Sequence, residues 1–455
     1  MLAMASSALG FSQVAKNAKV VEQFAGGSYD GAWRWMWQML AYQFDHVAWT
    51  GCAFWDLIQP SFMFMVGVAV PFSNARRQKD GQSLTRRFFH VLWRAAVLVA
   101  LGVFLSSNGA DLTNFTFVNV LTQIGLGYPL LYLLSEKTGR REDLGGWLKV
   151  QCGAALVILL GYWGWFAYTD MPEADVAQLK NAVQTQKKKL VDGDWNQFEG
   201  LASHWNKHTN AAAVADRTLL NLVPRTGDEV DGRKFWINDG GYQTLNFIPS
   251  LATMLFGLMA GTVLRSEAGD RKKLKWLFVA GGICFVASMA VDTTIWPSAI
   301  SDALGAKWTL CPAVKRIWTP TWAVFSTGWT LWILAAFYLV IDIWQFRRWS
   351  WALAVVGVNS ITMYMMSQLM RGFTRSSLKT HLATVDSWLG SCIHSLQDTS
   401  VGDWLASWFD PKQGIVYHLF SPEFAYSPIT ERLAVLFVFW LACVWLHSQK
   451  IYVRI

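Results

Sequence analysis

Residues 44–73 read FDHVAWTGCAFWDLIQPSFMFMVGVAVPFS, and this stretch decides the fold. Its second part, Phe54–Phe72, is apolar enough and long enough to cross a bilayer. Asp56, Gln59 and Pro60 nevertheless lie inside this apolar run. Because ionisable groups at membrane depth are costly, an acidic residue there indicates a functional site. The plainer interpretation is that such a residue only bonds to neighbouring helices and locks their packing. Proline cannot donate its backbone nitrogen, so we also expect a kink near Pro60.

His46 lies just before this span and is preceded by Asp45. Histidine suits general-base chemistry near neutral pH, and a carboxylate beside it would orient its ring. Adjacent residues on a helix do not face each other, which argues against Asp45 in that role. Asp56 can reach His46 only if the chain folds back before the helix starts, and we hypothesise that it accepts a hydrogen bond from His46. The alternatives are a histidine bonded to headgroups or to a loop carbonyl, and Lys315 or Arg316 as the partner of Asp56.

The whole composition is that of a membrane protein. Of the 455 residues, 53% are hydrophobic and only 15% are charged, well below the roughly 25% of soluble domains. The 27 Trp and 28 Phe residues are typical of a chain with many side chains at membrane interfaces. The net charge of +8 does not indicate nucleic-acid binding, because the basic residues lie in short loops between apolar segments. The six cysteines have no metal-binding spacing, so no metal site is expected.

Apolar segments predict an all-α polytopic bundle of about ten transmembrane helices, in one domain over residues 1–455. A short first segment ends near Val14 and is followed by nine spans. These are Gly51–Ser73, Phe89–Leu105, Thr116–Leu134, Trp147–Tyr168, Asn246–Leu264, Leu277–Val291, Thr321–Ile343, Trp351–Met370 and Leu433–Leu446.

The short basic loops predict the orientation, since such loops stay in the cytoplasm. If the spans alternate, five basic segments emerge on one side: 76–87, 137–141, 265–275, 347–348 and 450–454. We therefore expect a bacterial inner-membrane protein whose C-terminus and short basic loops are cytoplasmic. His46 and two long insertions, residues 169–245 and 371–432, would then lie on the outer side. The first insertion begins with an amphipathic helical pattern over Ala174–Leu190.

The ordered motif around His46 resembles a known family. The chain reads His46-x-x-Trp-x-Gly-x-x-x-x-Asp56-Leu-x-x-Pro60, then a Phe/Met run, then Gly67-Val-x-x-Pro-Phe-Ser73. This pattern is similar to that of the heparan-α-glucosaminide N-acetyltransferase family, which are polytopic transmembrane acyltransferases. The chain lacks the Ser-Leu-Asp-x-x-Arg-Gly-like segment with which family members begin.

The resemblance extends over most of the membrane portion. Pro312–Trp322 is similar to the family's Lys-x-x-Trp-Ser/Thr turn, and Gly357–Tyr364 to its Gly-x-Asn-Ser-Ile-x-x-Tyr helix. One departure lies in the span Thr116–Leu134, where the family's Gln-Arg pair is replaced by Thr122-Gln123, which removes a cation.

The resemblance implies that His46 is catalytic, either as a general base or as a transient acetyl acceptor. In the family, the helix that carries Asn359 contributes to the catalytic cavity, so Asn359 would bind the thioester carbonyl or position His46, with Ser360 beside it. The alternative for this polar pair is a clamp between helices.

Three residues of the Pro312–Trp322 turn, Lys315, Arg316 and Trp318, would bind an anionic sugar or anchor the membrane interface. Asn119 and Gln123 share a helix face and would line a cavity or serve packing.

The implied donor is acetyl-CoA, and the basic loop with Arg76, Arg77, Arg86 and Arg87 would attract its phosphates or serve only as a topology signal. The expected function is transfer of an acetyl group to an amino or hydroxyl group of an extracytoplasmic sugar or glycan. The partners are then the lipid bilayer, acetyl-CoA and the glycan, with a homodimer allowed and no nucleic acid. A transporter or flippase of a small polar or lipid-linked solute is the alternative, and an assembly protein with receptor-like loops is a third reading.

Overall fold

The computed structural model describes residues 7–17, 30–137, 144–170, 176–177, 181, 197–225, 234–235, 237–305, 308–396 and 414–453. Regular structure in these residues is helical, apart from two isolated bridges, so the all-α prediction is confirmed. The chain forms two compact units. Unit 1 contains Met1–His46, Ala53–Ile58 and Arg348–Arg454, and unit 2 contains Val47–Cys52, Gln59–Arg347 and Ile455.

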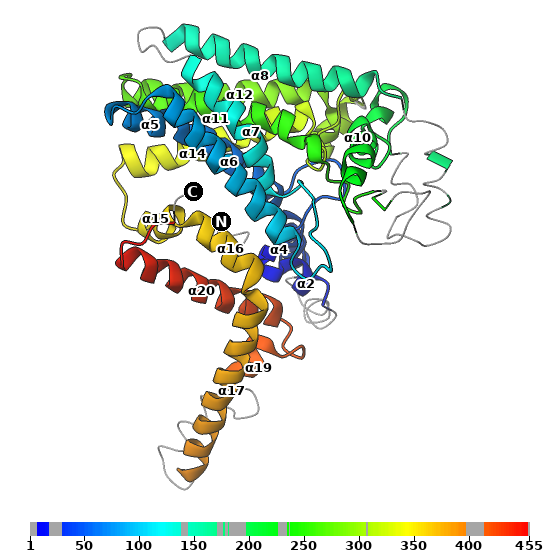
Figure 1. The fold of residues 1–455 in the computed structure, drawn as a ribbon. Helices are drawn as coiled ribbons and strands as arrows, with labels where there is room; N and C mark the ends of the chain where they lie inside the picture. The colour runs from blue at the N-terminus through cyan, green and yellow to red at the C-terminus, as the bar shows by residue number, and fades with distance from the viewer. Residues whose placement is uncertain are drawn as a thin grey trace. The chain divides into compact units, whose positions relative to one another are not determined.

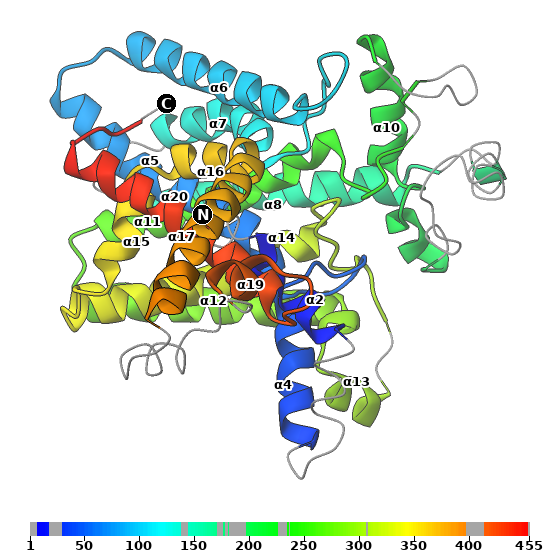
Figure 2. The ribbon, with the colours of Figure 1, turned by 90° about the horizontal axis from the view of Figure 1, so that it is seen from below.

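Unit 2 holds most of the long helices. In chain order these are α5 (Ile58–Lys79), α6 (Leu84–Ser106), α7 (Val120–Lys137), α8 (Leu144–Ala167), α10 (Ala211–Leu219), α11 (Phe247–Arg265), α12 (Asp270–Val291), α13 (Ser298–Leu304) and α14 (Pro320–Phe337). Short 3-10 turns lie at Gly200–Trp205, Leu220–Leu222, Thr244–Asn246 and Thr293–Ile295, and a π-helical turn, Tyr338–Ile343, extends α14. Helix α8 lies along α11 (Figure 1), and α6 lies along α7 (Figure 2).

Glycines let α5 and α11 come into backbone contact within unit 2. A Cβ added at Gly67 would lie 1.9 Å from the Met254 carbonyl oxygen, and one at Gly257 would lie 2.0 Å from that of Phe64. Lipid chains are as apolar as leucine, so helices in a membrane gain most by such close packing. Helix α11 is accordingly the most buried candidate span of the unit.

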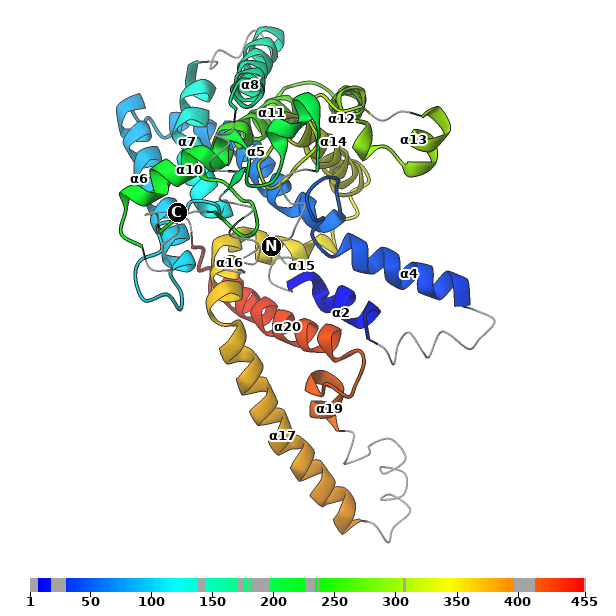
Figure 3. The same ribbon diagram turned by 90° about the vertical axis from the view of Figure 1, so that its right-hand side faces the viewer.

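Unit 1 contains the N-terminal helices, the start of the first span and the helices that follow Arg348. Its helices are α2 (Phe11–Ala15), α4 (Asp30–Gln43), α15 (Ser350–Val358), α16 (Ser360–Leu369), α17 (Arg371–Ser395), α19 (Ile415–Phe420) and α20 (Ser427–Ser448), with 3-10 turns at Ser7–Gly10 and Phe54–Leu57. Helix α20 packs against α17 and α19 (Figure 3). Helices α15 and α16 are bent by 78° where they meet at Asn359.

Within the described residues, seven helices are long and apolar enough to cross a membrane, or eight if the bent pair α15–α16 is one span. Eight of the nine spans expected after Val14 each overlap one long helix, and the ninth, Trp351–Met370, falls on the bent pair α15–α16. Helix α7 is not among the seven, because Gln123, Glu136 and Lys137 reduce the mean hydropathy of its 18 residues. The described part of the N-terminal segment, residues 7–17, forms a 3-10 turn and the five-residue α2. A total of ten transmembrane helices therefore stays a prediction, whereas the seven long apolar helices support a membrane protein with several spans.

The first span differs from expectation at its start. A 3-10 turn, Phe54–Leu57, leads directly into α5, and Pro60 lies in the first turn of that α-helix. Proline is tolerated there because the first backbone N–H groups of a helix have no carbonyl partner in the preceding turn. A helix kink at Pro60 is therefore unnecessary. The amphipathic pattern at Ala174–Leu190 lies almost wholly outside the described residues.

Candidate active site

The side chains of His46 and Asp56 form a direct pair in unit 1. Nδ1 of His46 lies 2.6 Å from Oδ1 of Asp56. The Asp56 side chain is 1% exposed, whereas that of His46 is 39% exposed. When Asp56 is ionised it only accepts hydrogen bonds, so the tautomer of a neutral His46 that fits this contact has its proton on Nδ1 and an acceptor at Nε2. The pair therefore has a buried orienting group and an imidazole that reaches the surface.

The first turn of the membrane span fixes the carboxylate of Asp56. Its Oδ2 accepts the backbone N–H of Ala53 at 3.2 Å, while its own N–H donates to the Ala53 carbonyl at 3.0 Å. Both carboxylate oxygens thus have donors, which compensates for part of the cost of burying the charge. Asp45 bonds to the backbone of His46, because its Oδ1 accepts the His46 N–H at 2.8 Å.

The chain folds back between His46 and the span, as the predicted pair requires. Gln43, the last residue of α4, accepts the Phe54 N–H with its Oε1 at 2.8 Å. The ring of Phe44 packs against Phe54 and Trp55, with centroids 5.8 and 6.3 Å apart. Residues on both sides of the fold-back therefore hold the start of the span against the end of α4. The predicted hydrogen bond between His46 and Asp56 is confirmed.

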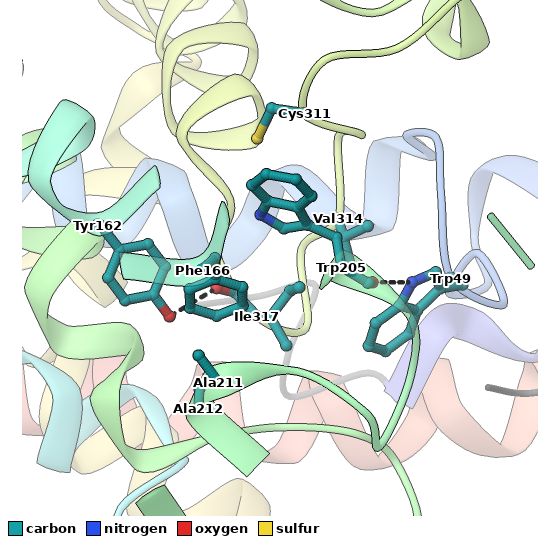
Figure 4. Packing of buried hydrophobic residues seen from close by; sticks show 9 residues of the cluster. All are labelled: Trp49, Tyr162, Phe166, Trp205, Ala211, Ala212, Cys311, Val314 and Ile317. Atoms are coloured by element: carbon teal, nitrogen blue, oxygen red, sulfur yellow. Dashed lines mark hydrogen bonds between the residues drawn. The ribbon is translucent and has the colours of Figure 1, made fainter. Parts of the chain in front are cut away.

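The segment Val47–Cys52 belongs to unit 2, where the first long insertion holds it. The indole N–H of Trp49 donates to the Trp205 carbonyl at 3.1 Å (Figure 4), and Gly51 N–H donates to the Ala313 carbonyl at 3.2 Å. Trp205 is fully buried and stacks on Phe166. This role of Trp205 was not predicted. A tryptophan in an otherwise polar insertion was the available signal.

The predicted turn with Lys315, Arg316 and Trp318 is a compact, mostly buried part of unit 2. Trp318 is 1% exposed, and its indole N–H donates to Thr253 Oγ1 at 3.2 Å. The expectation that Trp318 anchors the membrane interface is therefore wrong, since an interfacial indole must reach headgroups. Lys315 is also buried.

Arg316 bonds to backbone carbonyls from two other segments. Its guanidinium donates to Gly240 at 2.8 Å and to Val47 at 3.2 Å, and it lies over the Tyr242 ring. The guanidinium thereby ties the Val47–Cys52 segment to the first insertion. Sugar binding by these residues stays a prediction.

Asn359 lies at the bend between α15 and α16 and binds the C-terminal segment of unit 1. Its side-chain nitrogen donates to the Ile451 carbonyl at 3.1 Å, and its side-chain oxygen accepts the Val453 N–H at 3.0 Å. Its side-chain amide therefore bonds two backbone groups of the C-terminal segment at once. These contacts fit the clamp alternative, and a catalytic role for Asn359 or substrate binding by Ser360, the first residue of α16, stays a prediction.

Asn119 and Gln123 hold α7 in place within unit 2. Asn119 accepts the N–H groups of Leu121 and Thr122 at 3.1 Å each and donates to the Gly102 carbonyl of α6 at 2.9 Å. Gln123 is buried and donates to the carbonyls of Phe117 and Thr244. These contacts support the packing alternative for both residues.

The four arginines expected at the acetyl-CoA phosphates have different surroundings. Arg87 is buried and pairs with Glu136 at 2.6 Å, joining α6 to α7. Arg77 lies 3.3 Å from His90 Nδ1, and the backbone N–H of Arg86 bonds to the cap residue of α6. Arg76 and Arg86 are exposed at the surface. Phosphate binding stays a prediction, and Arg87 is the least suited to it because a carboxylate already neutralises its charge.

A buried acid in the first insertion was not anticipated. Asp216 lies in α10, and burial raises its pKa from the ordinary 3.8 to about 6, although the N–H of Thr244, 2.9 Å from Oδ2, opposes this. Cys311 is buried as well, and burial raises its pKa to about 12, so it remains a neutral thiol. The sequence signal for a buried acid was the position of Asp216 directly after the Ala-rich run of α10, since small apolar residues favour close packing.

Searches of the sequence against models of protein families and against curated proteins found no match. The family resemblance therefore rests on the ordered motif around His46 and the turns and helices that accompany it. The pair of His46 and Asp56 is the part of that motif whose geometry suggests chemistry.

Proposed function

We propose that this chain is a membrane-embedded acyltransferase that moves an acetyl group from acetyl-CoA to an amino or hydroxyl group of a sugar acceptor. The observation that carries the proposal is the contact of 2.6 Å between a buried Asp56 and a partly exposed His46. A buried carboxylate that holds the Nδ1 proton of a histidine is the arrangement by which a general base is oriented.

In direct transfer, the acceptor nitrogen or oxygen attacks the thioester carbonyl while Nε2 of His46 takes its proton. The new bond from carbon to nitrogen or oxygen forms, the C–S bond breaks, and CoA leaves as a thiolate that receives the proton from the imidazolium. Throughout these reaction steps, Asp56 keeps the imidazole oriented and stabilises its positive charge. The carboxylate itself exchanges no proton.

In two-step transfer, Nε2 itself attacks the thioester and carries the acetyl group as an N-acetylimidazolium, because Nδ1 keeps its proton and Asp56 balances the positive charge. The C–S bond breaks in the first step, and the leaving thiolate takes a proton from solvent. The acceptor then attacks the acetyl carbon, the bond from Nε2 to that carbon breaks, and the acceptor's proton passes to solvent, which restores the neutral imidazole. Both routes use the same two residues, and accumulation of acetylated protein without acceptor distinguishes them.

The membrane setting supports a donor and an acceptor on opposite sides. Seven long apolar helices support an integral membrane protein, and the distribution of Lys and Arg favours a cytoplasmic position for the basic loops. Acetyl-CoA is a cytoplasmic anion, so Arg76 and Arg86, both exposed, are the arginines most suited to attract it. The acceptor would then approach from the side of the two long insertions.

The test uses the purified full chain in detergent with a panel of acyl-CoAs. A specific donor raises the apparent stability by mass action, by about 2.7 kcal/mol at a concentration one hundred times its Kd. We expect acetyl-CoA to raise the apparent Tm more than free CoA does. Isotope-labelled acetyl-CoA and a panel of amino sugars then show the transfer itself. If no acyl-CoA changes the Tm and no label moves, the proposal fails.

A transporter remains the second candidate because of the bend in the pair α15–α16. Broken helices line substrate sites in many transporters, and this bend of 78° lies at the polar Asn359. The chain's own C-terminal segment occupies the polar groups of Asn359, however, which gives the bend a structural explanation. Uptake of labelled amino sugars into proteoliposomes without any acyl-CoA would favour the transporter.

A further inference from the structure

Helix α4, which ends three residues before His46, presents an exposed apolar strip. Trp35, Met39 and Tyr42 are 64%, 39% and 53% exposed. Their spacing of four and three residues places them on one face of the helix. Large aromatic side chains exposed together in this way indicate a surface that meets something other than water.

The other side of α4 is packed against unit 1, so the helix has distinct buried and exposed faces. Trp37 points inward and packs against Phe11 of α2 and against Tyr426, with ring centroids 6.1 and 5.9 Å apart. Helix α4 lies next to α2 in unit 1 (Figure 3). Along the other border of the exposed face, Arg34 and Gln38 are exposed and form a polar edge. The helix thus has a packed side, an apolar exposed strip and a polar exposed edge.

The attachment of α4 determines its depth in the membrane. The Oε1 atom of Gln43, at the end of α4, accepts the N–H of Phe54, which is the first residue of the span Phe54–Lys79. The first residue of a span lies near the boundary between hydrocarbon and headgroups. At 14 residues, α4 is about 21 Å long, too short to cross the roughly 30 Å hydrocarbon core. A helix of this length that is attached at the boundary can lie along it, and the exposed apolar strip gives it a reason to do so.

We infer that α4 is an interfacial helix whose Trp35, Met39 and Tyr42 strip is embedded in the headgroup layer of the lipid bilayer. Trp and Tyr prefer this layer because their rings are apolar and their N–H or O–H groups bond to polar groups. Arg34 and Gln38 face phosphates and water at the edge of the strip, which is the usual division of an interfacial amphipathic helix. The inference does not depend on the proposed activity.

The position of His46 follows from this arrangement. Because α4 ends at Gln43, a helix in the headgroup layer keeps His46 at the membrane surface and not in the bulk solvent. Any acceptor that reaches His46 must then do so at the level of the headgroups. A lipid-linked acceptor satisfies this condition without leaving the bilayer.

The test is photo-crosslinking of the full chain in nanodiscs of phosphatidylcholine and phosphatidylglycerol. The photoreactive residue p-benzoylphenylalanine replaces Trp35 or Tyr42 in separate variants, and Gln38 on the polar edge in the matched control. Val157, exposed on the candidate span Leu144–Ala167, is the positive control for lipid contact. We expect lipid adducts at 35 and 42 in yields near that at 157 and several-fold above that at 38.

Two outcomes would overturn the inference. Yields at 35 and 42 as low as at 38 would mean that the strip faces water. Crosslinks from 35 and 42 to a second copy of the chain, in place of lipid, would mean that the strip is a protein interface. Because both positions are exposed, replacement by another aromatic residue removes little packing, and two independent sites protect the result against failure of one variant.

Discussion

The Nδ1 atom of His46 and the Oδ1 atom of Asp56 lie 2.6 Å apart, although ten residues separate them along the chain. The contact joins the end of a short helix to the first turn of a membrane span, and Asp56 also accepts the Ala53 N–H with its second oxygen. A carboxylate held in this way cannot rotate without losing both contacts. It therefore presents one fixed lone-pair direction to the imidazole.

His46→Ala should abolish acetyl transfer and leave folding close to wild type, because the side chain is partly exposed and little packing is lost. Donor-dependent stabilisation should persist, since the donor's binding energy comes mainly from other groups. The matched control is Asp45→Asn, which can still accept the His46 N–H and should retain activity. Transfer of labelled acetyl and the apparent Tm are the two measurements. A His46→Ala protein with most of its turnover would show that the active site lies elsewhere.

Asp56→Asn should lower the transfer rate by about 10²-fold or more, the usual contribution of an oriented general base. The amide keeps the shape and can still accept the Ala53 N–H, so stability should change little. The rates of the single variants and of the His46→Ala, Asp56→Asn double variant form a cycle. If Asp56 acts through His46, the double variant is no slower than His46→Ala alone. A further loss of the same size in the double variant would mean that Asp56 acts independently.

The basic loops should be cytoplasmic, because short loops rich in Lys and Arg are not translocated. The six native cysteines are first replaced, and single cysteines are then placed at Gln78 and at Leu222, both exposed. A membrane-impermeant maleimide on intact cells should label Leu222→Cys at once and Gln78→Cys only after permeabilisation. The reverse pattern would invert the predicted orientation and with it the side on which the donor binds.

Asn359→Ala should lower stability by about 1–2 kcal/mol, because it leaves the N–H of Val453 and the carbonyl of Ile451 without their partner. Removal of the residues from Ile451 onward should cause a similar loss of apparent Tm. The two changes together should cost no more than either one, since they remove the same contacts. Ser360→Ala is the matched control. Full additivity of the two losses would show that Asn359 stabilises the protein by other contacts.

Asp216 should make stability depend on pH. Its pKa is about 6 in the folded protein and near 3.8 when unfolded, so the folded state binds the proton more tightly. Stability from this group is therefore complete below about pH 4 and declines as pH rises through 6, by roughly 3 kcal/mol in all. Asp216→Asn cannot ionise and should gain apparent Tm relative to wild type as the pH increases from 5 to 7.5. A constant difference between the two proteins over that range would exclude the effect.

Much of the helical architecture could be predicted because it depends on local pattern. A run of about twenty apolar residues must satisfy its backbone hydrogen bonds within itself when it enters lipid, and only a helix does so. Each expected span after Val14 accordingly overlaps a helix, except Trp351–Met370, which falls on the bent pair α15–α16. The α15–α16 bend at Asn359 was not foreseen, because a polar residue inside an apolar run can bond in many ways without breaking the helix.

The sequence by itself determined that His46 precedes a membrane span with a carboxylate near its start, and that a fold-back would be needed to join them. Only the tertiary structure decided that the fold-back occurs, since it depends on the Gln43 side chain and on the packing of Phe44 against Phe54. The same holds for Trp318, whose place at the start of an expected span suggested an interfacial side chain and which packing buries. Contacts between residues distant in the chain depend on the summed fit of many side chains, whereas helix formation in lipid depends on one segment at a time.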